Sequence, residues 1–200
     1  MKRTINIRGD HAVVRTLSPK AKRALLPRTR GQVVIRHTRE NVYNPVYSQA
    51  MTLGSLLSPR TFPRQIASAR KNPAVTYSKQ VNLNKSSQNK IDEFYRRRRI
   101  DDKTTHDKRT MAVIDKVRDK LFEIGITVNS HHVNCGLRKK TPIFFEIDFI
   151  YYPTLKKHID ALPQRTPTQA LKKKQAKVLL TAIGKFRNRY DYIYCHVGSP

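Results

Sequence analysis

The chain has 200 residues and a mass of 23.2 kDa, which suits one domain or one domain with a long extension. Lys and Arg number 41 against 14 Asp and Glu, giving a formal net charge of +27. Self-repulsion of that size opposes compaction unless a polyanion neutralises it, and a nucleic-acid backbone is the most direct neutraliser. No apolar stretch approaches the ~18 residues of a spanning helix, so we expect no membrane partner.

The cysteines and the amino terminus bear on the compartment. Cys135 and Cys195 form neither a CxxC pair nor a disulfide framework, and both fit small buried hydrophobic positions. No apolar segment follows Lys2 and Arg3, as a secretory signal would require. We therefore expect the cytoplasm or another reducing intracellular compartment rather than secretion.

Residues 1–40 are predicted to form a short, β-rich basic module or extension. Alternating or continuous apolar runs predict strands at 4–7, 11–17 and 32–37. Between the last two strands, Ser18 followed by Pro19 is typical of a helix start, and Pro27 marks its end. Up to Lys90 the only acidic residues are Asp10 and Glu40, so positive charge dominates this half.

Residues 41–106 are predicted to be an extended basic linker. Prolines punctuate the first part and apolar residues are sparse and aperiodic, apart from one short helix expected after Pro63. A second helix is expected at about 87–100, capped by Ser86 or Ser87. It ends in a run of four arginines, Arg96, Arg97, Arg98 and Arg99.

Residues 107–200 are predicted to form an α+β domain in the order α-β-β-α-α-β. Apolar residues at helical spacing predict helices at 107–124, 155–162 and 167–186. Strands are expected at 126–135, 142–153 and 190–197, with 142–153 as the central strand. The whole chain is thus expected to be α+β, with an antiparallel or mixed sheet, helices on one of its faces, and a largely extended amino-terminal region.

Clusters of basic residues are the candidate nucleic-acid-binding sites. Arginine forks match phosphate oxygens bidentately, so Arg96–Arg99 are the first candidates. Two further clusters could extend the same surface or serve solubility alone. They are Arg138, Lys139 and Lys140, and Lys172, Lys173, Lys174 and Lys177 on the outer face of the longest helix.

Other residue patterns suggest chemistry less directly. Glu146 and Asp148 share one face of the central strand, as metal-binding carboxylates of nucleases do, but structural ion pairs explain such placements more often. Tyr151, Tyr152, Tyr190, Tyr192 and Tyr194 could stack on unpaired bases or occupy ordinary sheet positions. His131 and His132 lack the spacing of zinc ligands, so no metal or other cofactor is expected.

These patterns favour a non-enzymatic nucleic-acid-binding protein, with RNA preferred over DNA. Long basic extensions that order on binding suit irregular folded RNA. A metal-dependent nuclease using Glu146 and Asp148 is the first alternative. A structural subunit of a ribonucleoprotein or virus assembly is the second.

Overall fold

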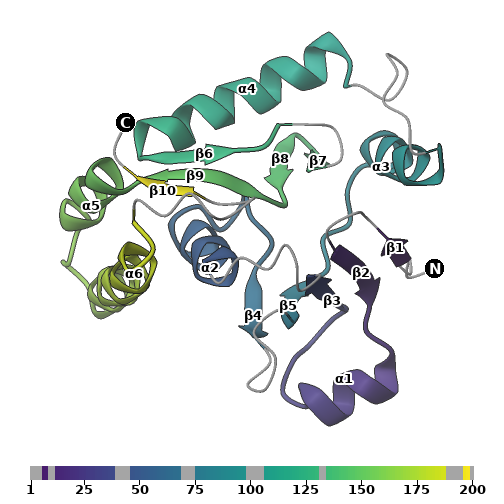
Figure 1. Cartoon of the computed structure of the whole chain (residues 1–200), viewed down its shortest axis with the longest axis horizontal. Coiled ribbons are helices and arrows are strands. Elements are labelled where there is room, and N and C mark those ends of the chain that lie inside the picture. Colours follow the sequence, from purple (N-terminus) through teal and green to yellow (C-terminus); the bar gives the residue numbers. More distant parts are fainter. Residues whose placement is uncertain are drawn as a thin grey trace.

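The computed structural model describes residues 6–8, 12–38, 46–68, 75–97, 106–130, 134–187 and 196–198. Within these ranges the protein is a mixed α+β fold whose strand pairs are antiparallel except for one. The strands form a five-stranded sheet, a three-stranded sheet and a two-stranded hairpin (Figure 1). Within the same ranges, no helix combines the length and hydropathy that a bilayer-spanning segment requires.

The amino-terminal half forms the five-stranded sheet, in the order β1-β2-β3-β5-β4. Its strands are β1 (Asn6–Arg8), β2 (Ala12–Thr16), β3 (Val33–Thr38), β4 (Gln65–Ser68) and β5 (Val75–Lys79). Alternation along β3 and β5 places Val33, Ile35, Val75 and Tyr77 on one face, where they build a small core with partly buried Leu17, Leu26 and Ile66. The predicted strands near 11–17 and 32–37 are therefore confirmed.

Helix α1 (Pro19–Leu25) connects β2 to β3 and projects at the lower end of the molecule in Figure 1. The Ser18 hydroxyl accepts a hydrogen bond from the Ala21 amide at 3.2 Å, and Pro19 occupies the first turn. None of its residues is buried. The helix start predicted from Ser18 and Pro19 is confirmed.

The three-stranded sheet lies in the carboxy-terminal half, in the order β10-β9-β6. Its strands are β6 (Ile126–Val128), β9 (Ile147–Tyr151) and β10 (His196–Gly198), and β10 runs parallel to β9. Helix α4 (Lys108–Glu123) lies on one side of this sheet and α2 (Tyr47–Leu57) on the other (Figure 1). Helices thus cover both faces, whereas the sequence pattern indicates one.

The expected central strand is broken in two. The pattern predicts one strand over residues 142–153, but β8 (Thr141–Phe144) pairs with β7 (Cys135–Arg138) in a hairpin, while β9 joins the other sheet. The chain bends at Phe145 and Glu146, between the two strands. The predicted strand 126–135 is split in the same way into β6 and the start of β7.

The stretch 46–84 is not an extended linker, contrary to expectation. It contains α2, β4 and β5, and a strand stands where a helix is expected after Pro63. Ala50, Met51 and Leu53 of α2 are buried in the main core together with Phe62. This core also receives side chains from α4, β9 and α6 (Pro167–Gly184), so it crosses the predicted boundary at 106/107. Whether residues 107–200 fold alone stays a prediction.

The remaining predicted helices are present. They are α3 (Lys85–Arg97), α5 (Tyr152–Asp160) and α6, alongside α4. Asp107 caps α4 by accepting from the Thr110 amide at 2.9 Å, and Thr166 opens α6 with a capping box to Gln169. Of the predicted last strand at 190–197, only residues 196 and 197 are described, and they belong to β10.

Candidate nucleic-acid interface

The described residues of the five-stranded sheet and α1 include basic side chains and no acidic ones. Between positions 12 and 84, the described part of the chain contains no Asp or Glu. Four exposed cations lie on α1 and on the loop that joins it to β3: Lys20, Arg23, Arg28 and Arg30. Because the described residues of this sheet include no carboxylate that could neutralise them, their charge is available to an anionic ligand. We call Lys20, Arg23, Arg28 and Arg30 the α1 basic surface.

Two apolar residues fix α1 against the sheet. Leu17 precedes the helix and Leu26 follows it, and both pack on the small core of β3 and β5. Leu25, the last helical residue, stays 55% exposed. The helix is thus attached at its two ends while none of its own residues is buried, which keeps Lys20 and Arg23 accessible.

The arginine run lies at the end of α3. Arg96 and Arg97 are the last residues of the helix, and Arg98 and Arg99 lie outside the described residues. The other end of α3 contacts the β7–β8 hairpin, where the Ser87 hydroxyl accepts from the Leu137 amide at 3.0 Å. A helix of this length spans about 20 Å. Arg96 and Arg97 are therefore separated from the hairpin by most of the length of α3.

The hairpin turn holds the second predicted cluster on the surface. Arg138, Lys139 and Lys140 are all exposed, and Lys139 has a positive φ of 59°. Asn84 holds the turn through two 2.7 Å hydrogen bonds, donating to the Lys139 carbonyl and accepting from the Lys139 amide. The backbone is thus fixed while the three side chains remain accessible to a ligand.

The lysines that the sequence assigns to the outer face of α6 differ in exposure: Lys174 and Lys177 are exposed, Lys172 is half-buried and Lys173 is buried. Lys173 is buried, and its ammonium donates to the carbonyls of Asp160 and Leu162 at 2.6 and 3.0 Å. Lys177 pairs with the Asp160 carboxylate at 2.9 Å, while Lys174 is exposed. Lysine stems pack readily against apolar surface, which explains how Lys173 can enter the α5–α6 contact. Lys173 is therefore a structural residue.

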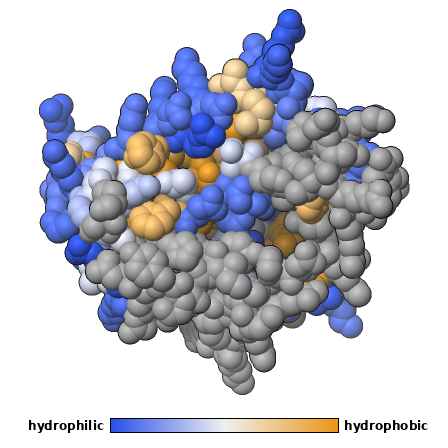
Figure 2. Space-filling view, turned by 45° about the horizontal axis from the view of Figure 1, so that its top comes forward, coloured by the Kyte–Doolittle hydropathy of each residue, from blue (hydrophilic) through white to orange (hydrophobic). Residues whose placement is uncertain are grey.

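These clusters lie on different parts of the molecule. Helix α6 is at the left in Figure 1, α3 at the right and α1 at the bottom. Figure 2 views the molecule with the upper side of Figure 1 turned forward, and its coloured surface is mostly hydrophilic with separate hydrophobic spots. Phe122 and Val113 of α4 are exposed by 56% and 37%. The lysines of α6 thus lie on the opposite side of the molecule from α3 in Figure 1, and of the two uses open to them, an extension of the α3 surface is less direct than solubility.

Glu146 lies at the bend between β8 and β9 and is only 5% exposed. Burial raises the pKa of Glu146 to about 7; the Arg36 guanidinium opposes this shift and Asp148 adds to it. Within the described residues, no cluster of three His, Cys, Asp or Glu side chains is arranged to hold a metal ion.

The remaining candidate residues have packing roles where the structure describes them. Tyr151 packs edge-on against Phe122 with ring centroids 5.5 Å apart, and the Arg187 guanidinium lies 5.6 Å from the Tyr152 ring centre. Burial raises the pKa of the Cys135 thiol to about 12, and Asp115 adds to this shift, so Cys135 behaves as the expected buried hydrophobic residue. The other candidates of this kind lie outside the described residues: Tyr190, Tyr192, Tyr194, Cys195, His131 and His132.

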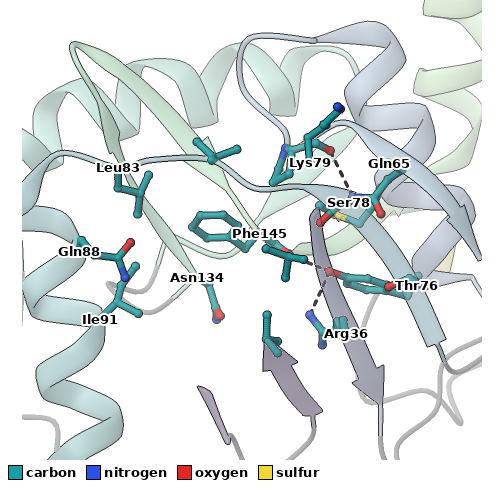
Figure 3. Close-up of a pocket in the computed structure, with 16 residues that line it drawn as sticks. Arg36, Gln65, Thr76, Ser78, Lys79, Leu83, Gln88, Ile91, Asn134 and Phe145 are labelled. Carbon is teal, nitrogen blue, oxygen red and sulfur yellow. Dashed lines mark hydrogen bonds between the residues drawn. The ribbon is translucent and has the colours of Figure 1, made fainter. Parts of the chain in front are cut away.

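A cavity of about 140 Å³ lies between the five-stranded sheet, α2 and α3. Figure 3 shows Leu83, Gln88 and Ile91 on one side, residues of the sheet on the other, and Phe145 and Asn134 between them. Arg36 donates to the Tyr47 hydroxyl at 3.0 Å, and Tyr47 in turn donates to the Phe145 carbonyl at 3.0 Å. This chain of hydrogen bonds ties the sheet to the bend that follows β8.

Sequence reasoning missed both the α1 basic surface and the cavity. The sequence does contain an indication of the α1 basic surface, because no acidic residue occurs between Asp10 and Glu40. No local pattern in the sequence indicates the cavity, since its lining comes from four strands (β2, β3, β4 and β5), from α2 and α3, and from the segments that hold Leu83, Asn134 and Phe145. Such a set becomes visible only when the topology is known.

Comparisons of the chain with protein families, curated protein sequences and solved structures found no match.

Proposed function

We propose that this protein is a non-enzymatic RNA-binding protein that contacts phosphates through the α1 basic surface. The observation that supports this most is the charge of the five-stranded sheet and α1, whose described residues include cations but no carboxylate. Elsewhere in the fold, carboxylates do neutralise lysines, as Asp160 does for Lys156 and Lys177 at 2.8 and 2.9 Å. Cations without such carboxylates nearby are the ones that phosphates would neutralise, with release of counterions.

The shape of the basic region favours RNA over duplex DNA. Helix α1 has 7 residues, about 10 Å of helix, and it is attached to the sheet at both ends. Such a short helix offers few positions from which side chains could read a major groove. Cations on a short helix and a loop suit the irregular backbone of folded or single-stranded RNA. Arg96–Arg99 and Arg138–Lys140 would extend the contacts to other parts of the same RNA.

Crosslinking in cells tests this proposal. Cells expressing the tagged protein are irradiated, and the nucleic acid covalently bound to it is purified and sequenced. A variant in which Lys20, Arg23, Arg28 and Arg30 are all alanine should recover far less RNA than the wild type. The control removes four exposed cations elsewhere, at Lys108, Lys116 and Lys120 of α4 and at Lys174 of α6, and should recover much more RNA than the test variant.

Two outcomes would contradict the proposal. One is recovery of DNA with no RNA above the level of a non-irradiated sample. The other is equal loss of RNA in both variants, which would mean that net charge matters and the α1 basic surface does not.

A further inference from the structure

We propose that the cavity between the five-stranded sheet, α2 and α3 binds one unpaired, pyrimidine-sized base of the RNA. The inference rests on the proposed RNA binding and specifies which part of the RNA the protein recognises. It is drawn from the size of the cavity and from its lining.

The size of the cavity fits a single six-membered ring. Its volume is about 140 Å³. A cavity of about 150 Å³ in a protein core is known to take a benzene-sized ligand. A pyrimidine ring is of that size, whereas the fused rings of a purine would extend from the cavity into its open side. Several lining side chains keep partial exposure, including Val14, Leu83 and Phe145, so the cavity is open to solvent.

The cavity offers apolar surface for the faces of a ring. Val34, Met51 and Ile91 are buried residues of its lining, and Phe145 adds an aromatic ring. Stacking of a base on an aromatic side chain contributes about 1–3 kcal/mol by alanine substitution. The backbone of Phe145 is held by the hydrogen bond from Tyr47, which helps to fix the position of this ring.

The cavity also offers unused hydrogen-bonding groups for the edge of a ring. Thr76 lines it and is only 6% exposed, yet its hydroxyl makes no hydrogen bond to another residue in the described ranges. The same holds, within those ranges, for the half-buried Ser78 hydroxyl and Asn134 side-chain amide. The Thr76 hydroxyl is not itself a fully buried atom, so water can reach it in the free protein and a polar ligand could take the place of that water. An apolar cavity with a few convergent polar groups is typical of a site for a small ring.

The charges around the cavity suit a nucleotide. No Asp or Glu belongs to its lining, and Arg36 belongs to it. Lys79 also contributes to the lining. Its Nζ lies close to Gly31: a Cβ added to this glycine would be 3.7 Å from the Lys79 Nζ. Leu17 and Leu26, which flank α1, pack on the face of the sheet that carries Val33 and Ile35. The cavity lies on the opposite face, which carries Val34 and Arg36, so phosphates flanking a bound base would reach the α1 basic surface only by passing the end of the sheet near Gly31.

The test uses the full-length protein and three labelled RNAs: an eight-residue oligouridine, an eight-residue oligoadenosine, and a GC-rich RNA hairpin that serves as the duplex. Fluorescence anisotropy should give tighter binding to oligouridine than to oligoadenosine. The variant Thr76→Val with Asn134→Leu removes hydrogen-bonding groups at nearly constant volume. It should lower affinity for oligouridine by about three- to tenfold, as expected for one or two lost hydrogen bonds, and leave duplex binding unchanged.

Thr181→Val is the matched control, because its hydroxyl bonds to the Lys177 carbonyl on the exposed side of α6. It should bind all three RNAs like the wild type.

A second experiment uses oligouridine that carries 4-thiouridine. It should crosslink to residues of the cavity, and mass spectrometry identifies the crosslinked residues. Equal affinities for the two single strands, an unchanged double variant, or crosslinks confined to α1 would each overturn the cavity proposal and leave RNA binding intact. Absence of binding to all three RNAs at low salt would overturn the proposed function as well.

Discussion

At the scale of single residues, Glu146 is expected to make stability depend on pH. Its pKa rises from 4.5 in the unfolded chain to about 7 in the fold, chiefly through burial. The folded protein therefore binds this proton more tightly, and unfolding releases it between about pH 4.5 and pH 7. The free energy of unfolding should fall across that window as pH rises, by about 3 kcal/mol at 1.36 kcal/mol per pKa unit.

Glu146→Gln should remove this fall, because the amide stays neutral at every pH. Urea unfolding of both proteins across the window should give similar stabilities at its acidic end and a more stable variant above pH 7. Burial lowers the pKa values of His37 and His158, which makes the free energy of unfolding rise with pH. This rise is common to both proteins and cancels in the difference between them. A difference independent of pH would contradict the assignment.

Lys173 and its neighbour Lys174 allow a matched comparison. Lys173→Met leaves two carbonyls, those of Asp160 and Leu162, without their donor. We expect a loss of about 2–3 kcal/mol in the free energy of unfolding. Lys174→Met changes an exposed side chain and should stay within about 0.5 kcal/mol of the wild type. Chemical denaturation measures both, and equal stabilities of the two variants would contradict the structural role of Lys173.

Residue types in the sequence indicate charge and capping well but not which lysine is buried. Ser18, Asp107 and Thr166 are recognisable as helix caps or helix starts because capping is local. The sequence pattern assigns Lys173 to an outer face because its burial depends on α5, which packs on α6 only in the folded chain. The cavity is unpredictable for the same reason, since Thr76 and Asn134 are 58 positions apart in the sequence.

At the scale of secondary-structure elements, α2 shows how tertiary packing can outweigh local signals. Its N-cap, Val46, provides no side-chain hydrogen bond, and Gly54 lies in its interior, a position that costs about 1 kcal/mol relative to alanine. A Cβ at Gly54 would come within 3.1 Å of both Ile147 and Phe62. The glycine thus allows α2 to approach β9 closely. Helices α4 and α6, with caps and regular apolar spacing, are predictable.

The position of α2 leads to a prediction about the folding unit. A fragment of residues 107–200 lacks α2 and with it Ala50, Met51 and Leu53, which are buried in the main core. We expect the fragment to show no cooperative thermal unfolding by circular dichroism, whereas residues 46–200 should show it. The loss would exceed that of one large-to-small core substitution, about 2–5 kcal/mol, because several side chains are removed together. A fragment 107–200 that unfolds cooperatively near the temperature of the full chain would support the predicted domain boundary instead.

At the scale of the whole molecule, the protein combines one large core with a five-stranded sheet that carries an excess of positive charge. The net charge of +27 is evident from composition alone and indicates a polyanionic partner. The spatial distribution of that charge is not evident from composition, because lysines of α6 that look equivalent in sequence divide into buried, paired and exposed ones. The exposed cations of α1 stand out only when the partners of the others are known.

The salt dependence of RNA affinity tests most directly whether the α1 basic surface binds phosphates. The logarithm of the association constant should fall linearly with the logarithm of salt concentration, by about 0.7 for each phosphate contact on single-stranded RNA. The variant lacking Lys20, Arg23, Arg28 and Arg30 should bind more weakly and with a slope shallower by about 3, as four lost contacts require. A slope that is unchanged in this variant, or near zero in the wild type, would contradict phosphate binding by this surface.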